Sequence, residues 1–192
     1  MNKSRLEAFS DGVLAIIITV MILEIKVPEN NTFESLKPLI PVILSYVLSF
    51  AYVGIYWNNH HHMFQAVKKV NGSILWGNLF LLFWLSLIPF GTSWIGSQDF
   101  AAVPMSVYGI ILLMCAISYT ILQNKIIKLE GKDSILYKAV EKDKKGKISL
   151  ACYISAVPLA FVSPWISGLL YTTVALIWII PDRRIEKQIN NN

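Results

Sequence analysis

Four long stretches of this chain contain no charged residue, and they limit the possible folds more than any other feature. They are Pro38–Val67, Val70–Gln98, Phe100–Asn124 and Ile148–Pro181. A helix of roughly 20 apolar residues crosses the hydrocarbon core of a bilayer, so each stretch is long enough to span it. Only 15% of the 192 residues are charged, whereas a soluble domain usually has about 25%. The sequence therefore predicts an all-α membrane protein.

We expect one transmembrane domain, residues 1–192, with six helices. The first apolar stretch, Gly12–Leu23, would rise only about 18 Å, so we expect other helices to enclose it. The last uncharged run would be about 51 Å long as one helix, and Ser163-Pro164 is expected to divide it into a hairpin. Between the fourth and fifth helices we expect a helical extension at Ser134–Val140 and a turn at Lys145-Gly146. The six helices are expected at about residues 4–26, 39–65, 73–95, 103–130, 147–163 and 165–182.

The positions of lysine and arginine indicate which side of the membrane each connection faces. With the N-terminus inside, 15 of the 17 lysines and arginines fall on cytoplasmic segments, and only Lys26 and Lys37 fall outside. This asymmetry follows the positive-inside rule and predicts a multi-pass protein of the cell (inner) membrane with both termini in the cytoplasm. A five-helix chain would place Arg183, Arg184 and Lys187 outside. The net charge of +5 therefore reflects topology and does not indicate a nucleic-acid partner.

The first helix has two different faces. At about 100° per residue, Ile16, Val20 and Leu23 share an aliphatic stripe, and Thr19 lies about 60° to its side. Ser10 and Asp11 lie more than about 100° away, on a face that can bond to other helices. The whole stripe comprises Arg5, Phe9, Gly12, Ile16, Val20 and Leu23. Ordinary helix packing is an alternative explanation of such a stripe in a membrane protein.

Asp11 needs a partner, because an unpaired ionisable side chain in a membrane helix is costly. The candidates are Arg5 and, on the second helix, the cluster Trp57-Asn58-Asn59-His60-His61-His62. Consecutive helical residues point about 100° apart, so at most two of the three histidines share a face. A metal site would need further carboxylate or cysteine ligands, and none lies nearby in the sequence. We therefore expect structural hydrogen bonds from the histidines and no metal site.

Three segments in the first half of the chain form a recognisable set. The first is Arg5-x-x-x-Phe9-Ser10-Asp11, the second is Trp57-x-x-His60-His61, and the third runs from Asn78 to Thr92 and includes Trp84, Pro89 and Phe90. In this order they resemble motifs of the transmembrane protein 175 family, the lysosomal potassium channels and their prokaryotic relatives. Beyond the third helix, only the number of spans resembles the family.

This resemblance implies a potassium-permeable cation channel with a pore lined by the first helix. One six-helix copy per chain implies a homotetramer around a central pore, in contact with the bilayer and with permeant monovalent cations, and without a cofactor. By position, the pore constriction falls on Ile16, Val20 and Leu23, and Thr19 matches a threonine linked to potassium preference. The signature residues are Arg5, Phe9, Ser10 and Asp11. The structural hydrogen-bond network implied by the family comprises Arg5, Ser10, Asp11, Trp57, His60 and His61.

The sequence is also compatible with functions other than that of a channel. A proton-coupled or other secondary transporter could use Asp11 and the cluster His60–His62 as a relay, although the sequence contains no internal repeat. An accessory membrane subunit without conductance is a further alternative. An enzyme is not expected, because the sequence has no nucleotide-binding glycine loop, nucleophile elbow or zinc-protease helix. The small cytoplasmic segments favour a leak-type channel without a regulatory domain.

Overall fold

The computed structural model describes residues 2–28, 30–140 and 143–179, and these ranges fold into helices joined by short connections. Within these described ranges, four segments are long and apolar enough to cross a membrane: Lys3–Leu23, Phe33–Gln65, Gly72–Ser97 and Ala102–Glu130. The elements are α1 (Lys3–Leu23), the 3-10 helix η1 (Phe33–Leu39), α2 (Ile40–Gln65), α3 (Gly72–Leu85), α4 (Ile88–Ser97), α5 (Ala102–Glu130), α6 (Ile135–Val140), α7 (Lys144–Leu159) and α8 (Pro164–Ile179).

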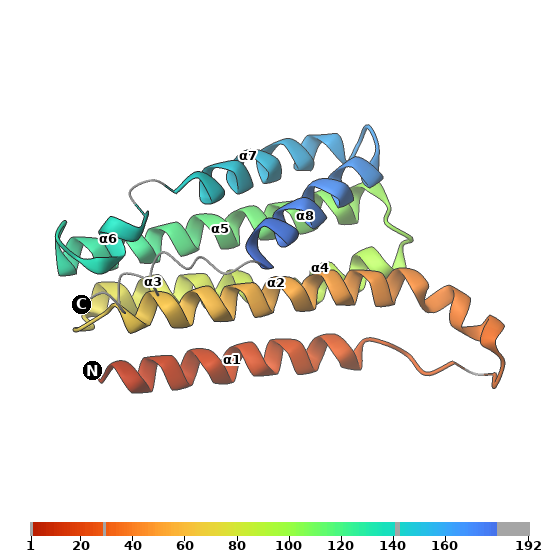
Figure 1. The fold of residues 1–192 in the computed structure, drawn as a ribbon. Helices are drawn as coiled ribbons and strands as arrows, with labels where there is room; N and C mark the ends of the chain where they lie inside the picture. The colour runs from red at the N-terminus through yellow and green to blue at the C-terminus, as the bar shows by residue number, and fades with distance from the viewer. Residues whose placement is uncertain (1, 29, 141–142, 180–192) are drawn as a thin grey trace.

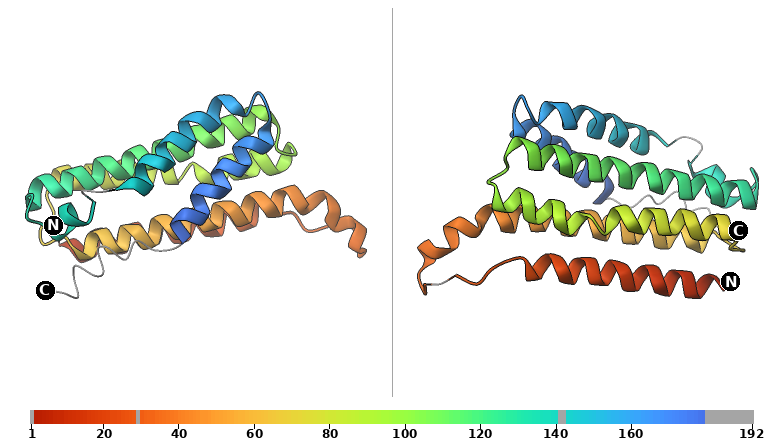
Figure 2. Two further views of the ribbon diagram at one scale, coloured as in Figure 1. Left: turned by 45° about the horizontal axis from the view of Figure 1, so that its top comes forward. Right: turned by 180° about the vertical axis from the view of Figure 1, so that it is seen from behind.

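The helices form a layered bundle with α1 at one edge (Figure 1). The middle of the bundle contains α2 and the α3–α4 pair, and the opposite side contains α5, α7 and α8. Figure 2 shows the same order from behind. The first helix packs on α2, α3 and α4, whereas α5 packs on α3, α4, α7 and α8. One end of the bundle therefore gathers the start of α1, the end of α2, the start of α3 and the end of α5 (Figure 1).

The third apolar segment, which we expected as one helix at 73–95, is divided into α3 and α4. The break falls at Ser86 and Leu87, just before Pro89. Proline has no backbone N–H, and its ring clashes with the carbonyl four residues earlier, here that of Leu85, so the helical hydrogen bonds cannot continue through this point. Ser86 compensates locally, because its hydroxyl donates to the carbonyl of Phe83 at 2.7 Å. The two helices continue along the bundle together (Figure 1).

The last two helices form the expected hairpin, with α8 beginning at Pro164. Proline is well tolerated at the first position of a helix. The turn expected at Lys145-Gly146 is wrong, because both residues lie in the first turn of α7. The side chain of Asp143 caps this helix by accepting a hydrogen bond from the backbone N–H of Gly146 at 3.1 Å, and such a cap stabilises a helix start. The expected helix end at 182 and the cluster Arg183, Arg184 and Lys187 lie outside the described residues.

Candidate functional site

The first helix presents its aliphatic stripe on the outside of the protomer. The side chains of Ile16, Val20 and Leu23 are 63%, 40% and 76% exposed, and Phe9 is exposed as well. The position of α1 at the edge of the bundle explains this exposure, because only one side of the helix faces α2, α3 and α4 (Figure 1). An uncovered apolar stripe of this length marks a surface that meets lipid, another subunit or an ion path.

The opposite side of α1 is buried in the bundle. Its buried residues recur every three or four positions and are Leu6, Ser10, Leu14, Ile17 and Met21. Thr19 lies on the exposed side, where its hydroxyl donates to the carbonyl of Ala15 at 2.9 Å. That bond uses the single donor of the hydroxyl and leaves oxygen lone pairs that can accept from water or contact a cation. The helix therefore carries an apolar exposed stripe with one hydroxyl beside it.

A chain of buried hydrogen bonds ties α1 to α2 and α3. The amide nitrogen of Asn78 on α3 donates to the hydroxyl of Ser10 at 2.9 Å, and Ser10 donates to the carbonyl of Leu6 at 2.9 Å. The amide oxygen of Asn78 lies 2.8 Å from Nε2 of His60 on α2. All three polar side chains are buried. Interhelical hydrogen bonds of this kind hold membrane helices together, because a buried polar group without a partner is costly.

A second contact joins α1 and α2 at the surface of the protomer. The indole N–H of Trp57 donates to a carboxylate oxygen of Asp11 at 3.0 Å. The ring of His61 stacks on Trp57 with centroids 6.3 Å apart, and Nε2 of His61 lies 3.0 Å from the amide nitrogen of Gln65. Arg5 is exposed, and its guanidinium group forms no hydrogen bond or ion pair with another residue in the described part of the chain. Within one protomer, the residues of the expected network therefore form two separate groups. In one group Asn78 links Ser10 to His60, and in the other Trp57 bonds to Asp11.

Sequence reasoning missed Asn78 as a member of this network. It appeared only as part of a motif, although a polar amide inside the uncharged run Val70–Gln98 was itself a signal. Such a residue needs a partner on another helix when it lies within the membrane. The two ends of its amide group allow it to accept from one neighbour and donate to another. Asn78 is therefore the side chain that joins the first three long helices.

A further buried cluster lies nearer the other end of α1. The hydroxyl of Thr92 on α4 donates to the hydroxyl of Ser49 on α2 at 2.6 Å, and Ser49 lies 2.8 Å from the hydroxyl of Tyr108 on α5. Thr92 also lies 3.8 Å from the sulfur of Met21, on the buried side of α1. Thr92 is part of the motif quoted above, but nothing in the sequence indicates its partners. The cluster holds α4 and α5 against α2, beside α1.

The described residues contain no group of three His, Cys, Asp or Glu side chains that could hold a metal ion. His60 faces Asn78 and His61 faces Trp57, so the two rings have different surroundings. Neither arrangement provides the converging nitrogen, sulfur and carboxylate ligands of a zinc or transition-metal site. The polar side chains instead act as hydrogen-bonding groups between helices.

These features define a polytopic helical membrane protein. Buried polar side chains such as Ser10, Asn78 and His60 bond to one another between helices, and the exposed surface carries large apolar side chains on α1, α2 and α3. Both properties are typical of helices packed within a bilayer. The first helix has a further property: one of its faces is apolar and uncovered, and the opposite face is hydrogen-bonded to other helices.

The chain belongs to the TMEM175 family of channels. Residues 5–89 match the family described as the endosomal/lysosomal potassium channel TMEM175. A potassium channel of Chryseobacterium sp. is 58% identical over 192 residues, which is the full length of both chains. A potassium channel of Chamaesiphon minutus is 33% identical over 182 residues, covering 86% of this chain and 88% of its own. The fold also matches a crystal structure from Chamaesiphon minutus, described as that of a homologue of the lysosomal potassium-selective channel TMEM175. The TM-score is 0.79 and the sequence identity is 32%, and the match covers 94% of this chain and 97% of that chain.

Proposed function

We propose that this chain is a potassium-permeable cation channel of the leak type that assembles as a homotetramer around a central pore. The family and the bacterial relatives named potassium channels support potassium as the permeant ion. In this proposal residues 1–192 form one transmembrane domain in the cell membrane, with both termini in the cytoplasm. Its six spans are α1, α2, the α3–α4 pair, α5, α7 and α8.

The observation that carries the proposal is the uncovered stripe on α1. Ile16, Val20 and Leu23 are exposed in the protomer although they are large and apolar. Four copies of this face around an axis would form stacked aliphatic rings over about 10 Å of helix. A narrow apolar ring excludes water and so acts as a hydrophobic constriction. The hydroxyl of Thr19 would add a polar layer between the rings, where it can replace part of the hydration shell of a potassium ion.

The hydrogen bonds of α1 support this role, because a pore-lining helix must keep its orientation. Ser10, Asn78 and His60 fix its buried side against α2 and α3. Asp11 and Trp57 are paired, but both remain exposed in the single protomer. We propose that a neighbouring subunit covers this pair, and that the exposed Arg5 joins the network in the tetramer. His61 would belong to the network through its stacking on Trp57.

The arrangement of the helices supports the proposed orientation. The start of α1, the end of α2, the start of α3 and the end of α5 share one end of the bundle (Figure 1). The end of α5, α6 and the start of α7 lie toward this end as well (Figure 1), and the lysines from Lys125 to Lys147 belong to this segment, apart from Lys142, which lies outside the described residues. The positive-inside rule assigns such an end to the cytoplasm.

The transporter alternative requires Asp11 and the cluster His60–His62 to pass protons. In the protomer the described partner of Asp11 is the indole of Trp57, which is a donor only and cannot relay a proton. His60 is bonded to Asn78 rather than to a carboxylate. These contacts favour a structural role for both residues.

Cysteine accessibility tests the proposal directly. Ile16→Cys, in a Cys152→Ser background, would place a thiol in the proposed pore, and a membrane-impermeant thiol reagent should then reduce potassium flux into liposomes. Leu44→Cys is the matched control, because Leu44 is a similarly exposed apolar residue on α2. Equal lack of reaction at both positions would place the stripe in lipid and refute the pore. Flux that requires a proton gradient would support the transporter instead.

A further inference from the structure

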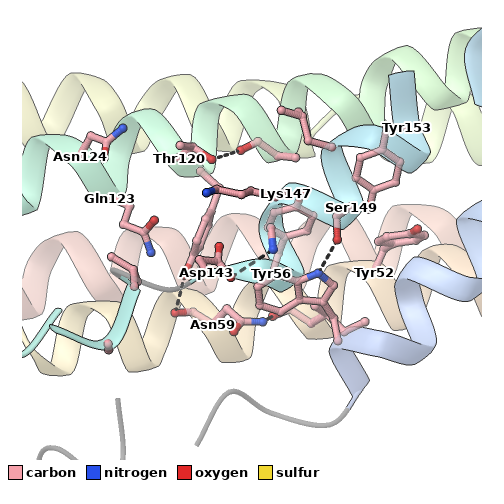
Figure 3. A pocket seen from close by; sticks show the side chains of 18 residues that line it. Tyr52, Tyr56, Asn59, Thr120, Gln123, Asn124, Asp143, Lys147, Ser149 and Tyr153 are labelled. Atoms are coloured by element: carbon pink, nitrogen blue, oxygen red, sulfur yellow. Dashed lines mark hydrogen bonds between the residues drawn. The ribbon is translucent and has the colours of Figure 1, made fainter. Parts of the chain in front are cut away.

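A cavity of about 320 Å³ lies in the protomer (Figure 3), and none of its described lining residues belongs to α1. It is lined by residues of α2, α5, α6, α7 and α8 and is partly open to the outside. This volume is at the lower end of the range for small-molecule sites, which is about 300–1,000 Å³. The cavity is separate from the stripe of α1, and the proposed conduction path makes no use of it.

Several polar side chains around the cavity have unused hydrogen-bonding capacity. The hydroxyl of Tyr56, the amides of Gln123 and Asn124, and the ammonium group of Lys147 have no hydrogen-bond partner among the described residues. Figure 3 shows that Tyr56, Gln123 and Lys147 come from three different helices and surround the same space. Each of these groups can donate, and Lys147 also carries a positive charge. A cavity with converging donors is suited to a ligand that carries anionic oxygens.

Asp143 is the one carboxylate among the described residues of the lining, and it is already engaged in a hydrogen bond. Asp143 accepts a hydrogen bond from the backbone N–H of Gly146 at the start of α7. The neighbouring Lys145 lies over the ring of Trp178, 5.7 Å from its centroid, and donates to the carbonyl of Ile177 at 3.1 Å. Among the described residues of the lining, the unused donors therefore belong to the ammonium group of Lys147 and to the amide groups.

Much of the remaining wall of the cavity is apolar or aromatic. They include Ile55 on α2, Ala116 on α5, Leu150 on α7 and the indole of Trp178 on α8, which donates to Ser149 at 2.8 Å. A free inorganic anion gains nothing from such walls. An amphipathic molecule gains from the donors and from the apolar walls. Its charged group meets the donors, while its adjoining methylene groups contact the apolar side.

The position of the cavity along the bundle suits a lipid of the inner leaflet. Asn124 and Lys147 lie toward the end of α5 and the start of α7, and the topology proposed above puts these ends in the cytoplasm. Basic pockets between transmembrane helices on the cytoplasmic side are known sites for anionic headgroups. We propose that this cavity binds the phosphate of an anionic phospholipid, with Lys147 and Gln123 as its main contacts. This inference rests on the topology of the proposed function, but not on conduction.

Thermal unfolding of the detergent-purified protein tests the inference. Phosphatidylglycerol should raise the Tm saturably, whereas phosphatidylcholine with the same acyl chains and inorganic phosphate should not. Lys147→Gln should weaken the apparent affinity for phosphatidylglycerol roughly tenfold, which is typical for the loss of one charge-assisted hydrogen bond. Gln123→Leu should also weaken it. Lys128→Gln is the matched control, because it removes the same charge from an exposed position at the end of α5 outside the cavity.

Each contrary result would overturn the inference in its own way. An equal shift with phosphatidylcholine would mean a general effect of lipid, and a full shift with inorganic phosphate would mean a site for soluble anions. Equal weakening in Lys147→Gln and Lys128→Gln would mean attraction to the basic surface alone. Potassium flux measured on the same preparations separates this inference from the proposed channel. Flux without a phosphatidylglycerol-specific shift refutes only the lipid site, and a specific shift without flux refutes only the channel.

Discussion

His60 and Asn78 meet inside the bundle, where Nε2 of the histidine lies 2.8 Å from the amide oxygen of the asparagine. The amide nitrogen of Asn78 donates to Ser10, so the amide oxygen is the group that faces His60. An amide oxygen can only accept, which means that Nε2 of His60 carries the proton in this contact. The asparagine thus fixes both the tautomer of the histidine and the position of α1.

We predict that Asn78→Leu destabilises the protein substantially. The N–H of His60 would be left buried without a partner, at a cost of about 1–3 kcal/mol, while Ser10 would keep its bond to Leu6. The Tm should fall, and size-exclusion chromatography should show less tetramer. Asn31→Ala, in the exposed connection between α1 and η1, is the control and should behave as wild type. Unchanged Tm and assembly in Asn78→Leu would show that the network contributes nothing.

The contact between Trp57 and Asp11 predicts a measurable coupling between the two helices. Trp57→Phe removes the indole N–H but keeps a ring that can stack on His61. A double-mutant cycle with Asp11→Ala should give a coupling of about 1 kcal/mol, because the bond involves a charged acceptor but is partly exposed to solvent. The measurement is the free energy of unfolding of the four proteins in the same detergent. A coupling near zero would mean that the two residues do not stabilise each other.

The two faces of α1 could be predicted from the sequence because helical periodicity fixes them. Ile16, Val20 and Leu23 share one face of α1 and Ser10 lies on another, as the spacing along the helix predicts. Asp11 also has a partner in the cluster that the cost of an unpaired carboxylate suggested. In both cases the controlling physics is local to one helix or follows from a single costly group.

Other features depend on contacts that a single sequence does not reveal. Thr92 and Ser49 are 43 positions apart, and nothing in their spacing indicates that their hydroxyls meet. The pairing of Asn78 with Ser10 is similarly distant in the chain. The break between α3 and α4 is easier to predict from the sequence, because a proline such as Pro89 disrupts the preceding helical turn in any protein. The single helix expected at 73–95 contains Pro89 near its end, whereas in the structure Pro89 lies in the first turn of α4.

Gly96 provides a test of the packing between α4 and α2. A Cβ atom at this position would lie 2.7 Å from the Cα of Val42, and neither backbone can yield easily. Gly96→Ala should therefore lower the free energy of unfolding by about 1–3 kcal/mol, as overpacking usually does. At Gly72, where a Cβ would meet no atom within 4 Å, the same substitution should be neutral or slightly stabilising, because alanine favours helix. Equal stability of the two variants would mean that the helices are farther apart than described.

Two adjacent residues of α1 allow the stripe to be tested for a role in conduction. Leu23 belongs to the stripe, whereas Ile22 lies about 100° away, and both are exposed in the protomer. In the proposed pore, Leu23→Ala widens an apolar ring and lowers the barrier to wetting, so potassium flux into liposomes should rise several-fold. Ile22→Ala removes a similar apolar volume outside the ring and should leave the flux unchanged, while both variants should elute like the wild type. If the two variants change the flux equally, the effect comes from general loosening of α1, and Leu23 does not face the conduction path.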